Sequence, residues 1–129
     1  MFSITIPTIS SNGDFVEFDL YELLTALQAR ALEARWLCSG VECLGAGADE
    51  LMEYAAFRAP ISGTNLYQLS LTIDQILAGV FEAFEVDENK PWLKIRVVHD
   101  KKIEFFSLNR NVLNRVARLY PQAAQVRSQ

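Results

Sequence analysis

The chain has 129 residues, of which 50% are hydrophobic and 22% are charged, and its formal net charge is −4 at pH 7. A chain of this size and composition is typical of one globular domain that buries its own core. It contains no apolar run of membrane-spanning length, and its first basic residue is Arg30, so the basic start of a signal peptide is missing. We therefore expect residues 1–129 to form one cytoplasmic domain without membrane contact.

Acidic and basic residues are unevenly divided along the chain. Residues 1–89 carry 3 basic and 14 acidic side chains, whereas residues 90–129 carry 9 basic and 2 acidic ones. Such asymmetry can mark contact with nucleic acid or a membrane, but it also arises when two halves of one fold neutralise each other. We favour the second interpretation because opposite charges across strands are routine and because a pI near 5.0 is unusual for a nucleic-acid binder.

The first residues predict a strand that turns back on itself. Residues 2–7 alternate apolar and polar side chains, which is the pattern of a half-buried strand. Asn12 and Gly13 follow, and this pair is the strongest short signal for a hairpin, so we expect residues 15–18 to form the returning strand. Pro7 favours an edge position because it cannot donate a hydrogen bond to a neighbouring strand.

Four segments show the apolar spacing of helices. Residues 20–31 follow an acidic capping arrangement, and residues 49–57 begin with acids that suit the helix dipole. The segment 65–78 is followed by Gly79, and glycine is favoured just after a helix. Residues 110–119 form the last of these segments, and the polar tail from about 122 is expected to fray.

The stretch from 80 to 108 predicts the centre of the sheet. Its three runs rich in β-branched and aromatic residues, 80–86, 92–99 and 103–108, are separated by short polar segments. Loops this short join antiparallel neighbours, because a parallel crossover needs a dozen or more residues. We therefore expect an α+β domain with an antiparallel sheet centred on this three-stranded meander. The helices packed on it are expected at about 20–31, 65–78 and 110–119.

Matching apolar faces sets the expected register of the meander. Glu82 is placed opposite Arg96, and His99 opposite Glu104. One apolar set then forms the core face, namely Phe81, Ala83, Leu93, Ile95, Val97, Phe106 and Leu108. The other face mixes charged residues with a second apolar set, namely Phe84, Val98, Ile103 and Phe105. A mixed face of this kind needs cover from another element or from a second subunit.

Cys38 and Cys43 lie in a predicted strand over residues 35–43, which carries a bulge at Gly40. Because the single histidine, His99, is far along the chain, a zinc site would need carboxylate ligands as well. We expect two buried free thiols, since free cysteine is among the most buried residue types and a disulfide is unusual in the cytoplasm. No metal site and no cofactor is predicted.

Asp74, Glu88 and Lys90 have the order of residues found in metal-dependent nucleases, where acids hold a divalent ion and lysine steadies the attacking water. That chemistry needs the Glu-x-Lys pair on a central strand, whereas this pair lies in a loop closed by Pro91. The glycines of residues 45–47 lack the lysine and the frame of a phosphate-binding loop. Neither pattern predicts a site.

A non-enzymatic protein-interaction module is the leading functional hypothesis, with a protein partner or a second copy of the chain in a homodimer. The expected interface is the second apolar set of the sheet, Phe84, Val98, Ile103 and Phe105. Nucleic acid is not an expected partner. This hypothesis depends on the two-sided apolar character of the sheet and on the lack of a catalytic motif.

The alternative hypothesis is an enzyme or a small-molecule-binding protein with a site around His99 and Glu104. Arg96, Glu82 and Tyr67 complete this candidate ligand site. A histidine–carboxylate pair can transfer protons, but no nucleophile stands in a recognisable catalytic frame. The sequence therefore assigns no catalytic residue.

Overall fold

The computed structural model describes residues 1–9, 13, 15–121 and 126–128. In this part of the chain an antiparallel sheet has the order β3-β2-β4-β5-β6-β1-β7. Its strands are β1 (Phe2–Pro7), β2 (Arg35–Gly45), β3 (Ile61–Ser62), β4 (Ile73–Phe84), β5 (Leu93–Val98), β6 (Lys102–Ser107) and β7 (Arg127–Ser128). The helices are α1 (Leu20–Leu27), α2 (Ala29–Leu32), α3 (Ala48–Phe57), α4 (Gly63–Ser70) and α5 (Arg110–Ala117). The predicted α+β class is confirmed.

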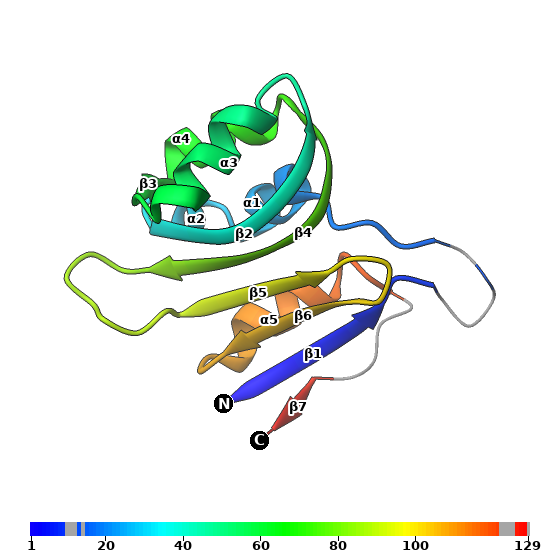
Figure 1. Cartoon of the computed structure of the whole chain (residues 1–129). Coiled ribbons are helices and arrows are strands. Elements are labelled where there is room, and N and C mark those ends of the chain that lie inside the picture. Colours follow the sequence, from blue (N-terminus) through cyan, green and yellow to red (C-terminus); the bar gives the residue numbers. More distant parts are fainter. Residues whose placement is uncertain (10–12, 14, 122–125, 129) are drawn as a thin grey trace.

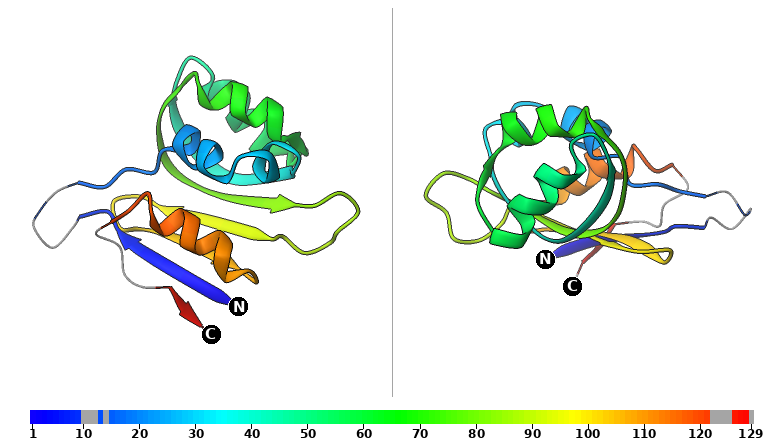
Figure 2. Two further views of the ribbon diagram at one scale, coloured as in Figure 1. Left: turned by 180° about the vertical axis from the view of Figure 1, so that it is seen from behind. Right: turned by 45° about the horizontal axis from the view of Figure 1, so that its top comes forward.

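The helices lie on one side of the curved sheet (Figure 1). The long pair β2 and β4 curves around α3 and α4, while α1 and α5 lie behind the meander of β4, β5 and β6 (Figure 2). Aromatic rings join the layers: Phe18, just before α1, lies 5.8 Å from Phe81 on β4 and 6.3 Å from Phe105 on β6. The sheet thus has an inner face under the helices and an outer face without them.

The core fills the space between the inner face and the helices. Apolar stripes on α1 and α5 turn inward, as their helical spacing predicts. The indole of Trp36 is fully buried beside them and donates a hydrogen bond to the carbonyl of Ala31 at 3.0 Å. The inner face itself is made of buried side chains from β1, β2 and the meander, namely Ile4, Ile6, Trp36, Cys38, Phe81, Ala83, Leu93, Ile95, Val97, Ile103 and Phe105.

The predicted pairing of β4 with β5 is wrong by two residues. Glu82 lies opposite Lys94, and Phe81 lies opposite Ile95, so the expected Glu82–Arg96 pair does not form across the ladder. Because side chains alternate with a period of two, a shift of two residues keeps every side chain on its face. The predicted inward set on these two strands is therefore confirmed although the partners differ.

The predicted pairing of β5 with β6 is wrong by three residues, and this odd shift exchanges the two faces of β6. Arg96 lies opposite Glu104, where His99 was expected, and Ile95 lies opposite Phe105. The hairpin closes tightly: Lys101 donates a backbone hydrogen bond to Val98 at 3.1 Å, around a left-handed Asp100. Such a three-residue loop with one left-handed residue is a common hairpin connection.

The predicted helix over 65–78 is correct only in its first half. α4 ends at Ser70, and β4 begins at Ile73, opposite Gly45 of β2. The apolar residues from 73 to 77 fit helical spacing, but pairing with the long strand β2 satisfies their backbone groups instead. Gly79, expected just after a helix, lies inside β4 with φ of 153°. A Cβ there would lie 3.1 Å from Val41 Cγ2.

The other expected elements follow the sequence more closely. The predicted helix over 20–31 is divided at Gln28, whose φ is 55°, and the strand 35–43 is present with its irregularity after Ser39. The expected return strand over 15–18 is reduced to one bridge between Ile9 and Phe15, while Asn12 lies outside the described residues. The short helix at 49–57 and the last helix are confirmed.

The expected fraying from about 122 falls partly on residues 122–125 and 129, which lie outside the described part of the chain. Among the described tail residues, Arg127 and Ser128 pair with β1 as strand β7. These two residues extend the sheet, and the expected fraying of the rest of the tail stays a prediction.

Candidate functional site

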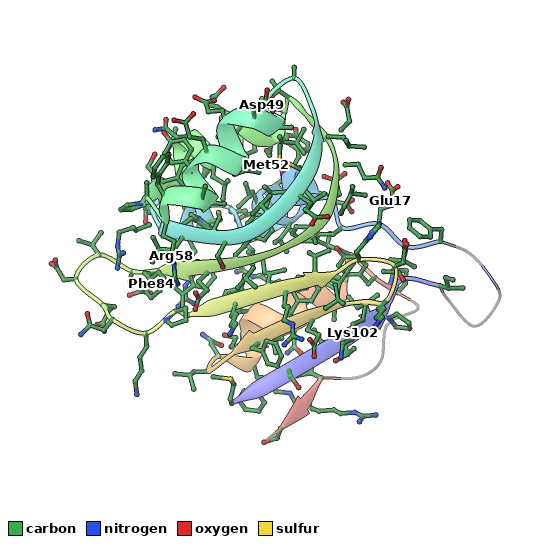
Figure 3. All side chains as sticks on the ribbon, viewed as in Figure 1. Glu17, Asp49, Met52, Arg58, Phe84 and Lys102 are labelled. Carbon is green, nitrogen blue, oxygen red and sulfur yellow. The ribbon has the colours of Figure 1, made fainter. Side chains whose placement is uncertain are left out.

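The outer face of the sheet carries side chains that point away from every helix. They alternate with the buried inner set along each strand, and Figure 3 shows Phe84 and Lys102 among them. Most are half-buried by their own neighbours rather than by a second layer. The outer face comprises Leu37, Val80, Glu82, Phe84, Lys94, Arg96, Val98, Lys102, Glu104 and Phe106.

Glu104 lies between two basic side chains on this outer face. Its Oε1 lies 3.6 Å from Arg96 Nε, and its Oε2 lies 3.7 Å from Lys102 Nζ. The two cations cover the carboxylate, whose side chain is 14% exposed, although Oε1 accepts no hydrogen bond from a described residue. Such surface pairs stabilise little, so they mainly determine where positive and negative charge lie on the face.

Two of the predicted interface residues lie on the outer face. Phe84 is 7% exposed because the guanidinium of Arg35 lies 4.7 Å above its ring. Arg35 also donates to the carbonyl of Glu88 at 3.3 Å, which holds it over the ring. Val98 is half-buried opposite Lys102. Phe84 is therefore covered by its own chain, and Val98 keeps part of its surface.

The assignment of Ile103 and Phe105 to the exposed set is wrong. Both side chains are 0% exposed and lie on the inner face, where the Phe105 ring contacts Tyr120 at 5.8 Å. Phe106 and Leu108, expected in the core, are half-buried and 59% exposed respectively. The altered register of β6 explains the exposure of all four residues. It puts Phe106 on the outer face, where Phe105 was expected.

The five residues of the alternative ligand site do not come together. Arg96, Glu104 and Glu82 lie on the outer face, and Glu82 faces Lys94 across the ladder. His99 lies in the β5–β6 turn with its Nε2 3.5 Å from Asp100 Oδ2. Tyr67 lies on α4, where its ring stacks on Tyr21 at 5.4 Å. These side chains occupy three separate places, so they form no common pocket.

The three residues with the nuclease-like order, which predicted no site, are also far apart. Asp74 stands at the start of β4, whereas Glu88 and Lys90 lie in the loop beyond its other end. Among the described residues, no three histidine, cysteine, aspartate or glutamate side chains are grouped as metal ligands would be. In the same part of the chain, no helix combines the length and apolar character needed to cross a membrane.

Cys38 and Cys43 are free, buried thiols, as predicted. Burial raises the pKa of Cys38 to about 12. Burial, together with the charge of Asp49, also raises the pKa of Cys43, whose Sγ donates to the carbonyl of Ala48 at 3.7 Å. Neither thiol has the lowered pKa of a reactive cysteine.

The raised pKa of Cys38 predicts a loss of stability at alkaline pH. An unfolded thiol loses its proton near pH 9, whereas the folded one keeps it to about pH 12. In that window the free energy of unfolding should fall by roughly 1.4 kcal/mol per pH unit. Urea unfolding at pH 8 and pH 10 should therefore show a smaller decrease for Cys38→Ala than for the natural chain. Equal decreases would contradict this role.

Two hollows adjoin each other along α3. The larger, of about 530 Å³, lies between α3 and α4 and is lined by Glu50, Tyr54, Asn65, Gln68, Leu69 and Thr72. The smaller, of about 250 Å³, shares Glu50 and Tyr54 and adds Glu53 and Phe57. The sequence does not reveal this groove, because only the approach of α3 to α4 in the folded chain creates it.

A third hollow, of about 350 Å³, lies between α2 and α5. Its polar lining is cationic or amide, from Arg30, Arg115, Asn109 and Asn111. Arg30 is already engaged, because its guanidinium lies 4.4 Å over the Trp92 ring and 3.1 Å from Glu85. This hollow therefore offers fewer free groups than the groove along α3.

No family model, no curated protein and no solved structure matches this chain. Among the described residues, the outer sheet face and the groove along α3 are the candidate functional surfaces.

Proposed function

We propose that this protein is a non-enzymatic protein-interaction module that forms a homodimer through the outer face of its sheet. One observation carries the proposal: the helices cover only the inner face, while the outer face mixes charged with apolar side chains. A sheet face with both kinds of residue and no covering layer is suited to pairing with another protein surface. A reducing compartment such as the cytoplasm fits the two free thiols.

The charges of the outer face suit pairing with a copy of itself. In a two-fold dimer the same patch meets itself, so each positive group needs a negative group on that patch. Glu104 and Glu82 supply two negative groups and Arg96, Lys94 and Lys102 supply three positive ones, so the face carries both signs although not in equal number. Val98 and Phe106 provide apolar area beside them, and aromatic residues are enriched at such interfaces.

Substituting Phe106→Glu should convert the proposed dimer into a monomer. The change replaces the apolar ring with a carboxylate, which pairing would have to desolvate even though Lys94 lies opposite it on β5. Sedimentation velocity across a range of concentrations should report a dimer for the natural chain and a monomer for the variant, with unchanged circular dichroism.

The matched control is Leu71→Glu, at the exposed end of α4, away from the outer face. It should leave the sedimentation of the natural chain unchanged. A natural chain that is monomeric at every concentration, or a Phe106→Glu variant that still dimerises, would overturn the proposal.

A further inference from the structure

At one end of the groove along α3, close backbone contacts hold two turns together. The turn before α3 is pinned to the turn after α4, where the Gly47 amide donates to the carbonyl of Thr72 at 3.2 Å. Gly45 approaches so closely that a Cβ would lie 2.5 Å from the same oxygen. The turns that join α3 and α4 to the strands are therefore held together by backbone contacts at one end of the groove, and Figure 2 shows both helices on the concave side of β2 and β4.

The groove lies in the acidic half of the molecule. Residues 36–89 carry nine acidic side chains and one basic one, Arg58, at the end of α3. The basic residues of the chain lie mostly beyond residue 90, and Figure 3 places Asp49 of α3 and Lys102 of β6 on opposite lobes. On the sheet Glu82 faces Lys94, as the expected neutralisation of the two halves requires, but Glu50 and Glu53 of α3 form no ion pair with a described residue.

The carboxylates that line the groove are uncompensated. Neither Glu50 nor Glu53 forms an ion pair with any residue that the structure describes. A concave site lined by one sign of charge concentrates its field and attracts ligands of the opposite sign. The preferred ligand of this groove is therefore cationic.

Each carboxylate is followed one helical turn later by an aromatic ring. Glu50 precedes Tyr54 and Glu53 precedes Phe57, each at a spacing of four residues on α3, which puts the pair on one side of the helix. Phe57 is 77% exposed, the largest exposure among the big apolar side chains described. A ring beside a carboxylate suits a guanidinium or ammonium group, which stacks on the ring and pairs with the acid.

We propose that the groove between α3 and α4 binds a lysine- or arginine-bearing segment of a partner protein. The inference rests on the proposed role as an interaction module but uses a different surface from the dimer face. Glu50, Glu53, Tyr54 and Phe57 bind the cationic side chains. Asn65 and Gln68 of α4 offer amide groups to the backbone of the segment on the opposite wall.

A second copy of this chain is the competing occupant, since the exposed side of α5 carries Arg110, Arg115 and Arg118. A head-to-tail contact of this kind would build open chains instead of a closed pair. A separate basic partner does not lead to open chains, and we therefore choose it.

The test is a titration of the isotope-labelled protein followed by NMR. The probe is a short amidated peptide that alternates arginine with leucine, and its control is the same peptide with citrulline in place of arginine. The arginine peptide should shift amide signals of α3 and of residues 65–72, and the citrulline peptide should not. Absence of binding, equal binding of both peptides, or shifts spread over the whole acidic half would overturn the proposal.

Variants separate the groove from the general negative charge. Glu50→Gln with Glu53→Gln should weaken the arginine peptide at least about tenfold, and Phe57→Ser should weaken it roughly threefold through the lost ring contact. Glu42→Gln with Asp74→Asn removes the same charge from exposed sites outside the groove. Equal weakening by both double variants would contradict a specific site.

Two further readouts keep this test separate from the dimer proposal. Phe106→Glu should bind the arginine peptide as well as the natural chain does, because Phe106 lies on the outer face. Salt-sensitive self-association that Glu50→Gln with Glu53→Gln abolishes would instead identify a second copy as the occupant, and would overturn the choice of a separate partner.

Discussion

Substituting Phe105→Ala should lower the free energy of unfolding by about 3–5 kcal/mol, the usual range for a fully buried phenylalanine. The ring is 0% exposed and lies between Phe18 and Tyr120, at 6.3 Å and 5.8 Å between ring centroids. Removing it leaves a cavity between the inner face of β6 and the helices, and the rings around it are too large to close the gap. Urea unfolding monitored by tryptophan fluorescence measures the loss.

The neighbouring substitution Phe106→Ala is the matched control, because it removes the same ring from the other face of the same strand. Phe106 is half-buried on the outer face, so its loss should cost about 1 kcal/mol or less in the monomer, as for surface positions. The measurement should be made at a concentration where sedimentation shows the monomer, so that dimer contacts do not contribute. A larger cost for Phe106→Ala than for Phe105→Ala would contradict the register of β6.

Substituting Gly63→Ala should lower the free energy of unfolding by about 3 kcal/mol, at the upper end for overpacking. Gly63 begins α4 against the end of α2, and an added Cβ would collide with the carbonyl oxygen of Ala31 and lie 2.6 Å from that of Leu32. Backbone atoms block the methyl group on this side, and the Gly63 amide is also bound to the carbonyl of Ala34 at 2.9 Å. To accept the methyl group, α4 must therefore move away from α2.

Thr64→Ala is the control for this position, since Thr64 is the next residue of α4 and is exposed. It should change stability by about 0.5 kcal/mol or less. Equal stability of Gly63→Ala and Thr64→Ala in urea unfolding would show that α4 does not pack against α2 as described. Because α4 forms one wall of the groove, Gly63→Ala should also weaken the arginine peptide.

The features predicted well from the sequence are those that depend on neighbours along the chain. The stripes on α1 and α5 follow from helical spacing, and the antiparallel meander follows from its short loops. The register of β6 could not be predicted, because Phe105 and Phe106 are adjacent and both apolar, so matching apolar faces gives no preference. Packing against Phe18 and Tyr120 decides between them, and this contact is not local.

The border between α4 and β4 shows the same limit. Ile73, Ile76 and Leu77 fit a helix by spacing, but their partner strand β2 lies far earlier in the chain. Ile73 pairs with Gly45, and Ile76 pairs with Cys43. Pairing with a distant strand overrides local preference. Because this pairing is not visible in the sequence, the helix predicted from spacing alone extends past Ser70, where α4 ends.

The candidate sites were predicted in part. The sequence indicated an outer face with Phe84 and Val98, but it included Ile103 and Phe105 and placed Phe106 in the core. For the groove, a signal was present in the four-residue spacing from Glu50 to Tyr54 and from Glu53 to Phe57. Its meaning depends on α4 lying alongside, which only the folded chain provides.

The most direct measurement on the proposed function is an isotope-filtered NOE experiment on an equal mixture of labelled and unlabelled protein. It detects protons that are close together on two different copies of the chain. We expect contacts between copies from the methyl groups of Leu37, Val80 and Val98 and from the Phe106 ring, all on the outer face. No contacts between copies, or contacts confined to the helices, would contradict the proposal that this sheet face is where the protein pairs.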